Sequence, residues 1–300
     1  MKSPDAIREE GMKSELKAWV YLAPALFFLV MFTYYPMLQV LWDSFFFKAY
    51  GQESAQFVWF DNYKRLFADP AFSQAVRNNL IYALGTVFPS LAVGFFLALA
   101  LMKSTKFRNF ARAVFFFPTL VPLIAAAALW IFVYFPNVGL LDYYLGKLGF
   151  GPTQWLGDSN IALYSLMLLA IWKNAGFYML FYISGLQGIG EEYYEAAELE
   201  GATWFQRLRY ITLPLLGPTT AFVFIIALIH VFTYVDHVVM MTHGGPIGST
   251  NLVLYYIFQN AHEFNDAAKA TASTVVSVGV LLAISFLSIR TMERGIHYES

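Results

Sequence analysis

Six stretches of the chain are apolar over about 20 residues each, and polar segments separate them. A helix of about 20 residues crosses the roughly 30 Å of hydrocarbon in a bilayer, so each stretch predicts a membrane-spanning helix. The predicted spans are Trp19–Phe46, Leu80–Met102, Val114–Tyr134, Ile161–Leu186, Ala221–Met241 and Ala270–Ile289. The pattern therefore predicts an all-α, polytopic membrane protein.

The segments that join the predicted spans differ in kind. Three contain Gly, Pro, Asn and Asp in mixtures typical of loops, at residues 48–77, 135–160 and 242–266. A fourth, Lys103–Arg108, is short and basic. The fifth, residues 188–218, is charged and not broken by Gly or Pro in its middle, so it predicts a short helix between spans four and five.

Prolines fall inside several predicted spans, where each removes a helix hydrogen bond and predicts a kink. They are Pro24, Pro36, Pro89, Pro118 and Pro122. Such kinks serve either helix packing or the rearrangement of a transport path, and both interpretations stay open.

The composition agrees with a membrane protein and excludes several chemistries. The chain is 58% hydrophobic and 13% charged, whereas soluble domains are about 45–50% apolar and about 25% charged. A net charge of −1 gives no general attraction to nucleic acid. The chain has no cysteine, which excludes disulfides and thiol catalysis, and its five histidines are scattered without metal-ligand spacing. We expect no catalytic site and no metal site.

The positions of Lys and Arg predict the orientation. With the N-terminus inside, the inner segments carry roughly twice as many of these residues as the outer ones, and cytoplasmic segments are enriched in them. Both termini are therefore expected in the cytoplasm. The expected organisation is a cytoplasmic segment at 1–18, one transmembrane domain at 19–290 and a cytoplasmic tail at 291–300.

The charged segment has the features of a docking helix. Glutamates crowd its start and Arg207 and Arg209 follow, an order that suits the helix dipole. Six residues at helical spacing are expected on one face built mainly of small side chains: Tyr194, Ala197, Glu198, Gly201, Ala202 and Phe205. Gly201 is expected to end or bend the helix. A helix lying on lipid would favour Lys and Arg, so a protein partner explains the glutamates better.

Within this segment Glu195-Ala196-Ala197, then Gly201-Ala202, then Ile211–Pro214 resemble the EAA loop of ABC-importer permeases. The resemblance implies a cytoplasmic coupling helix between spans four and five, seated in a cleft of an ATPase subunit. By position, the contact with the ATPase would be made by Glu195, Ala196, Ala197, Gly201 and Ala202. The family usually has Asp before the glycine, where this chain has Glu200 and so keeps the charge.

Other segments extend the resemblance to permeases of the carbohydrate-uptake class. They are Phe117–Pro122 with Trp130, Ile171–Phe177 with Gly185–Gln187, and His243–Pro246 with Leu254–Phe258. The opening, Trp19–Phe27, resembles the first of the two permeases in maltose, lactose and glycerol-3-phosphate importers.

The resemblance implies a permease subunit of the inner membrane that translocates a sugar or sugar-like solute, including the glycerol-phosphate type, by alternating access. The implied partners are a second permease, two cytoplasmic ATPase subunits, an extracytoplasmic solute-binding protein and the lipid bilayer. The chain has no Gly-x-x-x-x-Gly-Lys-Ser/Thr motif, so ATP and Mg²⁺ are expected on the partner ATPases, with no cofactor on this chain and no enzyme activity of its own.

Polar and aromatic residues inside the spans are candidates for the solute path, because polar groups there are costly and face the bundle interior. The candidates for the path are Trp172, Lys173, Asn174, Tyr178, Tyr234 and Asp236, and His230 and Asp43 are further polar candidates within the spans. Lys173 and Asn174 serve either the path or hydrogen bonding within the bundle. The aromatics suit either sugar stacking or packing, and Asp236 suits the membrane boundary as well as the path.

Three rival functions make different predictions. An ion-coupled secondary transporter predicts carboxylates near mid-membrane and inverted repeats, for which the sequence gives little sign. A structural membrane protein needs no coupling helix. An ABC permease for amino acids or peptides would share the loop, and only the more extended resemblance separates it.

Overall fold

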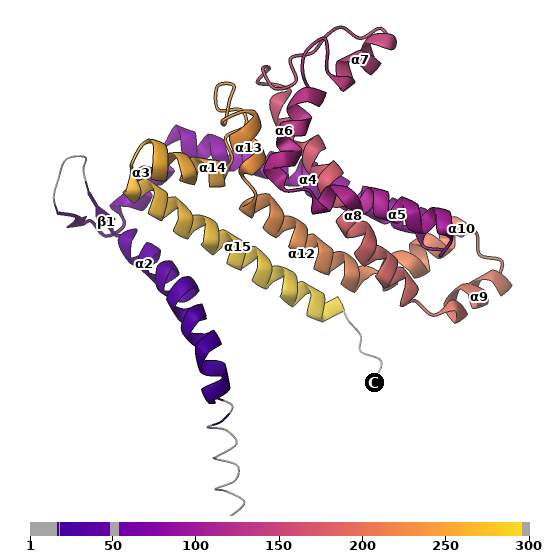
Figure 1. Cartoon of the computed structure of the whole chain (residues 1–300). Helices are drawn as coiled ribbons and strands as arrows, with labels where there is room; N and C mark the ends of the chain where they lie inside the picture. Colours follow the sequence, from indigo (N-terminus) through magenta and orange to yellow (C-terminus); the bar gives the residue numbers. More distant parts are fainter. Residues whose placement is uncertain (1–16, 18, 49–53, 296–300) are drawn as a thin grey trace, which may run out of the picture.

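A computed structural model describes residue 17, residues 19–48 and residues 54–295. Most of the expected N-terminal segment and the last residues of the expected tail lie outside this part. The described chain is built almost wholly of helices, which confirms the predicted all-α class (Figure 1). One short antiparallel hairpin, β1 (Phe46–Phe47) with β2 (Gln56–Phe57), follows the first helix.

Four helices of the described chain are long and apolar enough to cross a membrane. They are Trp19–Asp43, whose last part is α2 (Tyr35–Asp43), α4 (Pro70–Leu101), α8 (Ala162–Gln187) and α15 (Ala267–Gly295). Two bent pairs pass the same test: α5 (Lys106–Leu120) with α6 (Leu123–Val133), and Trp204–Leu215 with α12 (Gly217–Thr233). The predicted number of about six spans is reached when each bent pair counts as one.

The second span is longer than predicted. α4 begins at Pro70 rather than Leu80, because the Asp69 side chain accepts a hydrogen bond from the Ala71 N–H and so caps the helix start. Residues 48–77 are therefore not loop throughout. They hold the hairpin strand β2, α3 (Asp61–Phe67) and the first turns of α4.

The third and fifth spans are broken rather than continuous. α5 and α6 meet at an angle of 102°, at the place where Pro118 and Pro122 predict a kink. The predicted fifth span divides into α12 and α13 (Asp236–Met241), with Tyr234 and Val235 between them. No proline marks this second break, which explains why the hydropathy pattern missed it.

α8 forms the centre of the bundle, with α4 and α5 packed along it. Two glycines allow the close approach. A Cβ at Gly94 would lie 2.9 Å from the Cβ of Tyr178, and a Cβ at Gly176 would collide with the backbone of Phe115. These contacts fix α8 between its two neighbours, so side chains on α8 face the interior from a well-defined position.

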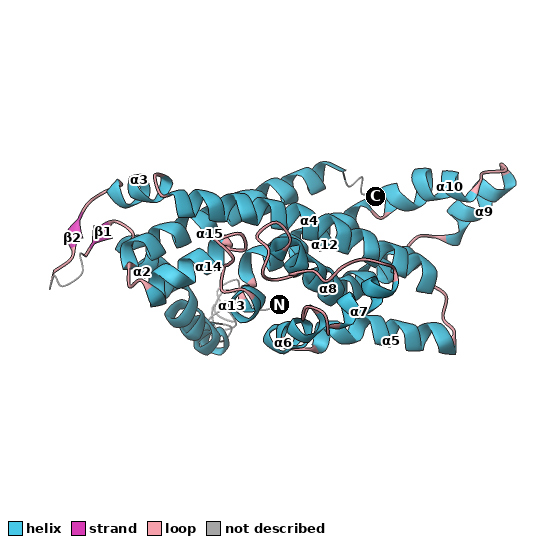
Figure 2. Cartoon of the chain, turned by 90° about the horizontal axis from the view of Figure 1, so that it is seen from above, coloured by secondary structure: helices cyan, strands magenta, loops and turns pink. Residues whose placement is uncertain are grey.

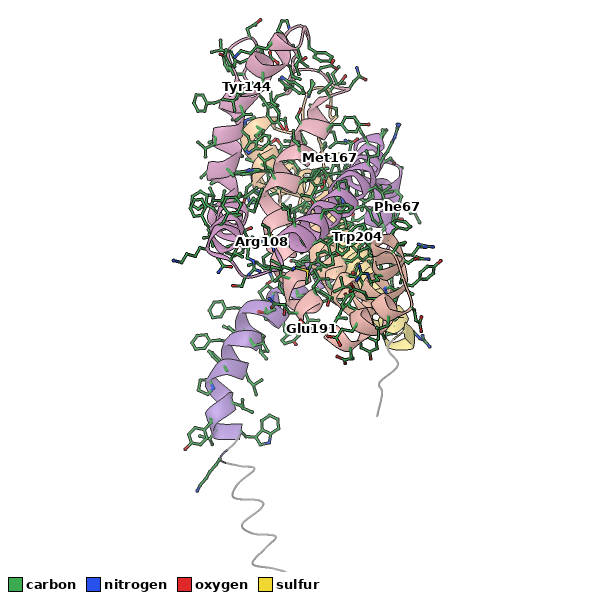
Figure 3. All side chains as sticks on the ribbon, turned by 90° about the vertical axis from the view of Figure 1, so that its right-hand side faces the viewer. Phe67, Arg108, Tyr144, Met167, Glu191 and Trp204 are labelled. Carbon is green, nitrogen blue, oxygen red and sulfur yellow. The ribbon has the colours of Figure 1, made fainter. Side chains whose placement is uncertain are left out.

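The helices at the two ends of the bundle are short. In Figure 1, α7 (Leu140–Lys147), α14 (Val253–Phe258) and α3 lie on the upper side of the bundle, and α9 (Glu191–Leu199) and α10 (Trp204–Arg207) lie at its right-hand side. Figure 2 shows α3 and α9 toward opposite sides of the molecule. Tyr144 of α7 and Glu191 of α9 lie far apart with Met167 of α8 between them (Figure 3). The chain is completed by α11 (Leu213–Leu215) and by π-helical turns at Val30–Tyr34, Leu208–Thr212 and Gln259–Glu263.

The first helix stands apart from this bundle. It extends away from the other helices at its N-terminal end (Figure 1), and nearly every side chain from Trp19 to Asp43 is exposed. Its upper part approaches α15. A surface this apolar and this exposed is one that lipid or another protein covers.

Candidate functional site

The charged segment folds as predicted at its start. α9 spans Glu191–Leu199 and is followed by Gly201 in the left-handed conformation, with φ +78°. The Ala202 N–H donates to the Ala197 carbonyl at 2.9 Å and closes the helix end. The prediction that Gly201 ends the helix is confirmed, because glycine adopts this conformation without the steric cost that a Cβ brings.

The predicted six-residue face is not formed. The capping box of Thr203 with Gln206 starts a second helix, α10, so Phe205 lies on a different helix from Tyr194 and Ala197. An ion pair between Arg207 and Glu198, with Nη1 and Oε2 3.1 Å apart, joins α10 back to α9. The expectation was wrong because it continued one helical period through a glycine that stops it.

Small exposed groups lie along α9 and its end. Glu195, Ala196 and Gly201 are exposed, and Ala197 and Ala202 are half-buried. Of the neighbouring apolar groups, sequence reasoning named Phe205 but missed Leu199 and Trp204. Leu199 is 91% exposed at the end of α9, and Trp204 and Phe205 follow on α10 with 61% and 64% exposed. An isolated leucine among glutamates was the available signal.

α9 is held at a fixed distance from the bundle. The Tyr194 hydroxyl lies 3.1 Å from Thr212 Oγ1, which ties α9 to the start of the next span. A cleft of about 880 Å³ lies between α9, α10 and the ends of α4 and α8, with Met102, Leu186 and Trp204 among its lining residues. The segment therefore projects from the bundle as a supported arm, not as a loose loop.

A second cluster of polar groups lies inside the bundle, around a cavity of about 20 Å³. That volume holds about one water molecule. The polar side chains of its lining come from α4, α8, α12, α13 and the break before α13: Tyr82, Thr86, Ser90, Lys173, Asn174, Tyr178, His230, Tyr234 and His237.

The cavity brings together four of the six residues predicted for the solute path. Lys173, Asn174, Tyr178 and Tyr234 line it. Trp172 instead points away, where it is 38% exposed and meets Trp130 edge to face, with ring centroids 5.5 Å apart. Asp236 lies exposed at the start of α13, outside the lining.

Apart from His230, the other polar lining residues were not predicted as candidates. Tyr82, Thr86 and Ser90 lie four residues apart on α4, a polar stripe in an otherwise apolar span that the sequence could have revealed. The Tyr82 hydroxyl lies 2.9 Å from His237 Nε2, and the Tyr178 hydroxyl lies 3.3 Å from His230 Nδ1.

Buried polar atoms of this cluster, among them Ser90 Oγ and His237 Nδ1, have no hydrogen-bond partner among the described residues. Buried polar groups are nearly always paired, so such atoms indicate a place where water or a ligand is bound at some stage. Asn174 bonds within its own helix, since its Nδ2 donates to the Ala170 carbonyl at 2.9 Å.

The ammonium of Lys173 is directed at backbone carbonyls. Its Nζ lies 3.1 Å from the Pro118 carbonyl oxygen, 3.4 Å from that of Thr119 and 2.5 Å from that of Val121. These carbonyls belong to the break between α5 and α6. The lysine is 7% exposed. Its side chain lines the cavity, and its ammonium group bonds to the carbonyls of the break.

At the α7 end, a buried carboxylate orders the loop between α6 and α8. Asp142 accepts hydrogen bonds from the Asn137 N–H at 2.8 Å, the Thr153 N–H at 3.3 Å and Trp155 Nε1 at 2.7 Å. Burial raises the pKa of the Asp142 carboxyl, but the hydrogen bonds outweigh it and hold the pKa below its usual value. The loop that α7 carries is therefore pinned by one charged group.

The loop between α13 and α14 is also braced. Asn78 Nδ2 donates to the carbonyls of Gly248 at 2.8 Å and Asn251 at 3.0 Å, and Gln74 donates to that of Ile247 at 3.1 Å. Ile247 stands at the tip, 90% exposed. The early start of α4 thus supplies the side chains that support this loop.

Comparisons with known proteins agree over nearly the whole chain. The model of the family described as "Binding-protein-dependent transport system inner membrane component" matches residues 90–298. The chain is 30% identical to "Probable ABC transporter permease protein YurN" of Bacillus subtilis, over 94% of this chain and 98% of that protein. It is 32% identical to "Sulfoquinovosyl glycerol transport system permease protein SmoG" of Agrobacterium fabrum, over 92% of this chain and 90% of that protein.

The fold is found among solved structures. A chain of a bacterial ABC transporter involved in the import of the acidic polysaccharide alginate superposes with a TM-score of 0.82. The alignment covers 95% of this chain and 98% of that chain at 22% identity. At that identity the likeness shows a shared fold.

Proposed function

The chain belongs to the family of binding-protein-dependent transport system inner membrane components, and on that premise we propose that it forms part of the path by which an ABC importer takes up a sugar or sugar-like solute. It is a multi-pass membrane protein and a permease component of the ABC class.

α9 is the element that couples this chain to a cytoplasmic ATPase. The observation that carries this assignment is Leu199, 91% exposed at the end of a supported helix with small residues beside it. Burying such a side chain in a partner's cleft contributes about 1.5–3 kcal/mol. Glu195, Ala196, Ala197, Gly201 and Ala202 are the residues proposed to line the contact.

This assignment sets the orientation. If α9 faces the cytoplasm, the α7 end faces outward, and an even number of spans brings both termini to the cytoplasmic side. The loops at the α7 end then receive the loaded solute-binding protein. Their bracing by Asp142 and Asn78 supports this role, because a docking surface needs a defined shape before its partner arrives.

The inner cavity is the part of the solute path that this chain supplies. Hydroxyl, amide and imidazole groups lie there beside aromatic rings, a combination that hydrogen-bonds and stacks with sugars. One relative is named for transport of sulfoquinovosyl glycerol, and the related structure for import of the acidic polysaccharide alginate. Trp172 and Asp236 stay predictions for the path, since they lie outside the lining.

The size of the cavity supports alternating access. A space of about 20 Å³ cannot hold a sugar, so solute can pass only when helices separate. ATP binding to the two partner ATPases supplies the energy, and it shifts the equilibrium only because those partners bind the two states differently. A second permease completes the path, and ATP and Mg²⁺ stay on the ATPases.

The test is uptake into proteoliposomes that contain this chain with its second permease and ATPase. The external solution holds the cognate binding protein and, in turn, a labelled neutral oligosaccharide, sn-glycerol 3-phosphate or an amino acid. The proposal is supported if the oligosaccharide or the glycerol phosphate is taken up and this uptake needs both ATP and binding protein. Uptake of the amino acid alone would contradict the solute class.

The same assay tests the coupling helix. A Glu195→Lys, Gly201→Asp double variant should insert normally but lose ATPase association and uptake. Transport that persists without ATPase would contradict the ABC mechanism and favour an ion-coupled transporter.

A further inference from the structure

The break between α5 and α6 leaves backbone acceptors without helical partners. The chain bends by 102° there, and Pro122 has no N–H to donate. The carbonyls at the end of α5 therefore face the same need as any helix C-terminus, where acceptors must be met by side chains or water. At the end of α5, the Val121 N–H donates to the Pro118 carbonyl at 3.3 Å.

Lys173 of α8 meets this need. Its Nζ donates toward the carbonyls of Pro118, Thr119 and Val121. The contact is returned, since Thr119 Oγ1 donates to the Lys173 carbonyl at 3.1 Å. The break is thus bonded to α8 in both directions.

The charge of Lys173 has no acidic partner in the described part of the chain. The ion pairs found there join Lys64 to Asp61, Arg207 to Glu198 and Lys269 to Asp69. An ammonium that is 7% exposed needs compensation. The negative end of the α5 dipole and three carbonyl oxygens provide it.

One turn further along α8, the two helices touch through backbone. A Cβ at Gly176 would collide with the backbone of Phe115 on α5. α8 therefore contacts α5 in two ways. Gly176 packs closely against α5 before the break, and the Lys173 ammonium bonds to the carbonyls at the break. α6 continues from the bonded segment, so its direction depends on the same contacts.

We propose that Lys173 is a positioning residue that clasps the broken span, so that α5, the break and α6 move with α8 as one body during transport. Its charge holds the bend and is not used to recognise the charge of the solute. The inference goes beyond the proposed function, and its structural test does not depend on which solute is carried.

The first test measures the bend in the assembled importer. The chain has no cysteine of its own. One chain can therefore carry two nitroxide labels, at Phe110→Cys on α5 and at Phe132→Cys on α6, where the native side chains are 68% and 74% exposed. Pulsed electron–electron double resonance then gives the distribution of distances between the two labels, with and without vanadate-trapped nucleotide. In the wild type we expect one narrow distribution that is the same in both states.

Variants at the clasp should change that distribution. Lys173→Met keeps the length of the side chain but removes the charge, and should broaden the distribution. Lys173→Arg keeps a cation and should restore a narrow one. Lys106→Met, the same substitution at an exposed lysine of α5, is the matched control and should have no effect. A distribution unchanged by Lys173→Met would overturn the proposal.

A further variant covers the case in which Lys173→Met does not assemble. Thr119→Val removes only the returned hydrogen bond and keeps the shape of the side chain. It should broaden the distribution by a smaller amount. If Lys173→Met does not assemble and Thr119→Val leaves the distribution of label distances unchanged, the proposal is contradicted.

The second test uses uptake kinetics to separate positioning from solute contact. Lys173→Met should lower the maximum rate roughly tenfold, which corresponds to about 1.4 kcal/mol in the barrier, and leave the half-saturating concentration of loaded binding protein unchanged. Lys173→Arg should recover most of the rate. If Lys173→Met instead changes the preference between a neutral oligosaccharide and sn-glycerol 3-phosphate at an unaltered label distance, the lysine contacts solute and the proposal is wrong.

Discussion

Replacing Gly201 with alanine should weaken ATPase binding through the shape of α9 alone. Gly201 has φ +78°, and no atom lies within 4 Å of the position that a Cβ would take. The added methyl group therefore meets no neighbour, and the cost is that of holding an L-residue in the left-handed region, about 1 kcal/mol. That energy corresponds to a roughly fivefold loss of affinity if α9 must keep its native end to bind.

The assay is titration of purified ATPase subunit onto the permease pair in nanodiscs. Gly201→Asn should bind nearly as the wild type does, because asparagine tolerates the left-handed conformation. Gly217→Ala is the matched control, since Gly217 lies at the start of α12 with equally open space. An affinity for Gly201→Ala equal to that of Gly217→Ala would refute the reasoning, because the backbone at Gly201 would then not matter for docking.

Leu199→Ser should leave assembly of the permease intact but weaken ATPase binding about tenfold, whereas Leu148→Ser, at a leucine of similar exposure beside α7, should not change it. Asp142→Asn should lower the thermal stability of the α6–α8 loop at pH 7. The pKa of Asp142 is lower in the folded than in the unfolded chain. The stabilisation is therefore present above the unfolded pKa of ~4 and is lost as the pH falls through the folded pKa. The thermal stabilities of wild type and variant should therefore become equal in acid. Asp69→Asn should destabilise the packing of α4 on α15 by about 1 kcal/mol in thermal unfolding, because it removes the 2.8 Å ion pair with Lys269.

The sequence predicts the parts of the fold that the membrane itself dictates. A helix in lipid must satisfy its own backbone and present apolar side chains, so long apolar stretches such as α8 are visible with nearly correct ends. The break at Pro118–Pro122 is also visible, because proline removes a helix hydrogen bond. The break at Tyr234 is not, because nothing in its side chains forbids a helix and the surrounding helices determine the turn.

The candidate sites were predictable to different degrees. Gly201 ends α9 as expected, since glycine has a local conformational advantage there. The cavity was only half predicted, because Tyr82 and Ser90 are recognised as a polar stripe only once α4 is known to face α8 and α12. Backbone carbonyls are one kind of partner expected for a buried lysine, but which carbonyls Lys173 meets could not be predicted, since every residue has one.

The most direct test of the central claim, that α9 docks on an ATPase, is a cross-link from its most exposed large apolar residue, Leu199. The importer is purified with Leu199→Cys carrying a photoactivatable benzophenone, and peptides of the cross-linked partner are sequenced. The account predicts a partner with a Gly-x-x-x-x-Gly-Lys-Ser/Thr nucleotide-binding motif, and no such product from Leu148→Cys beside α7. Leu199→Cys giving no ATPase cross-link in a complex that still transports would contradict it.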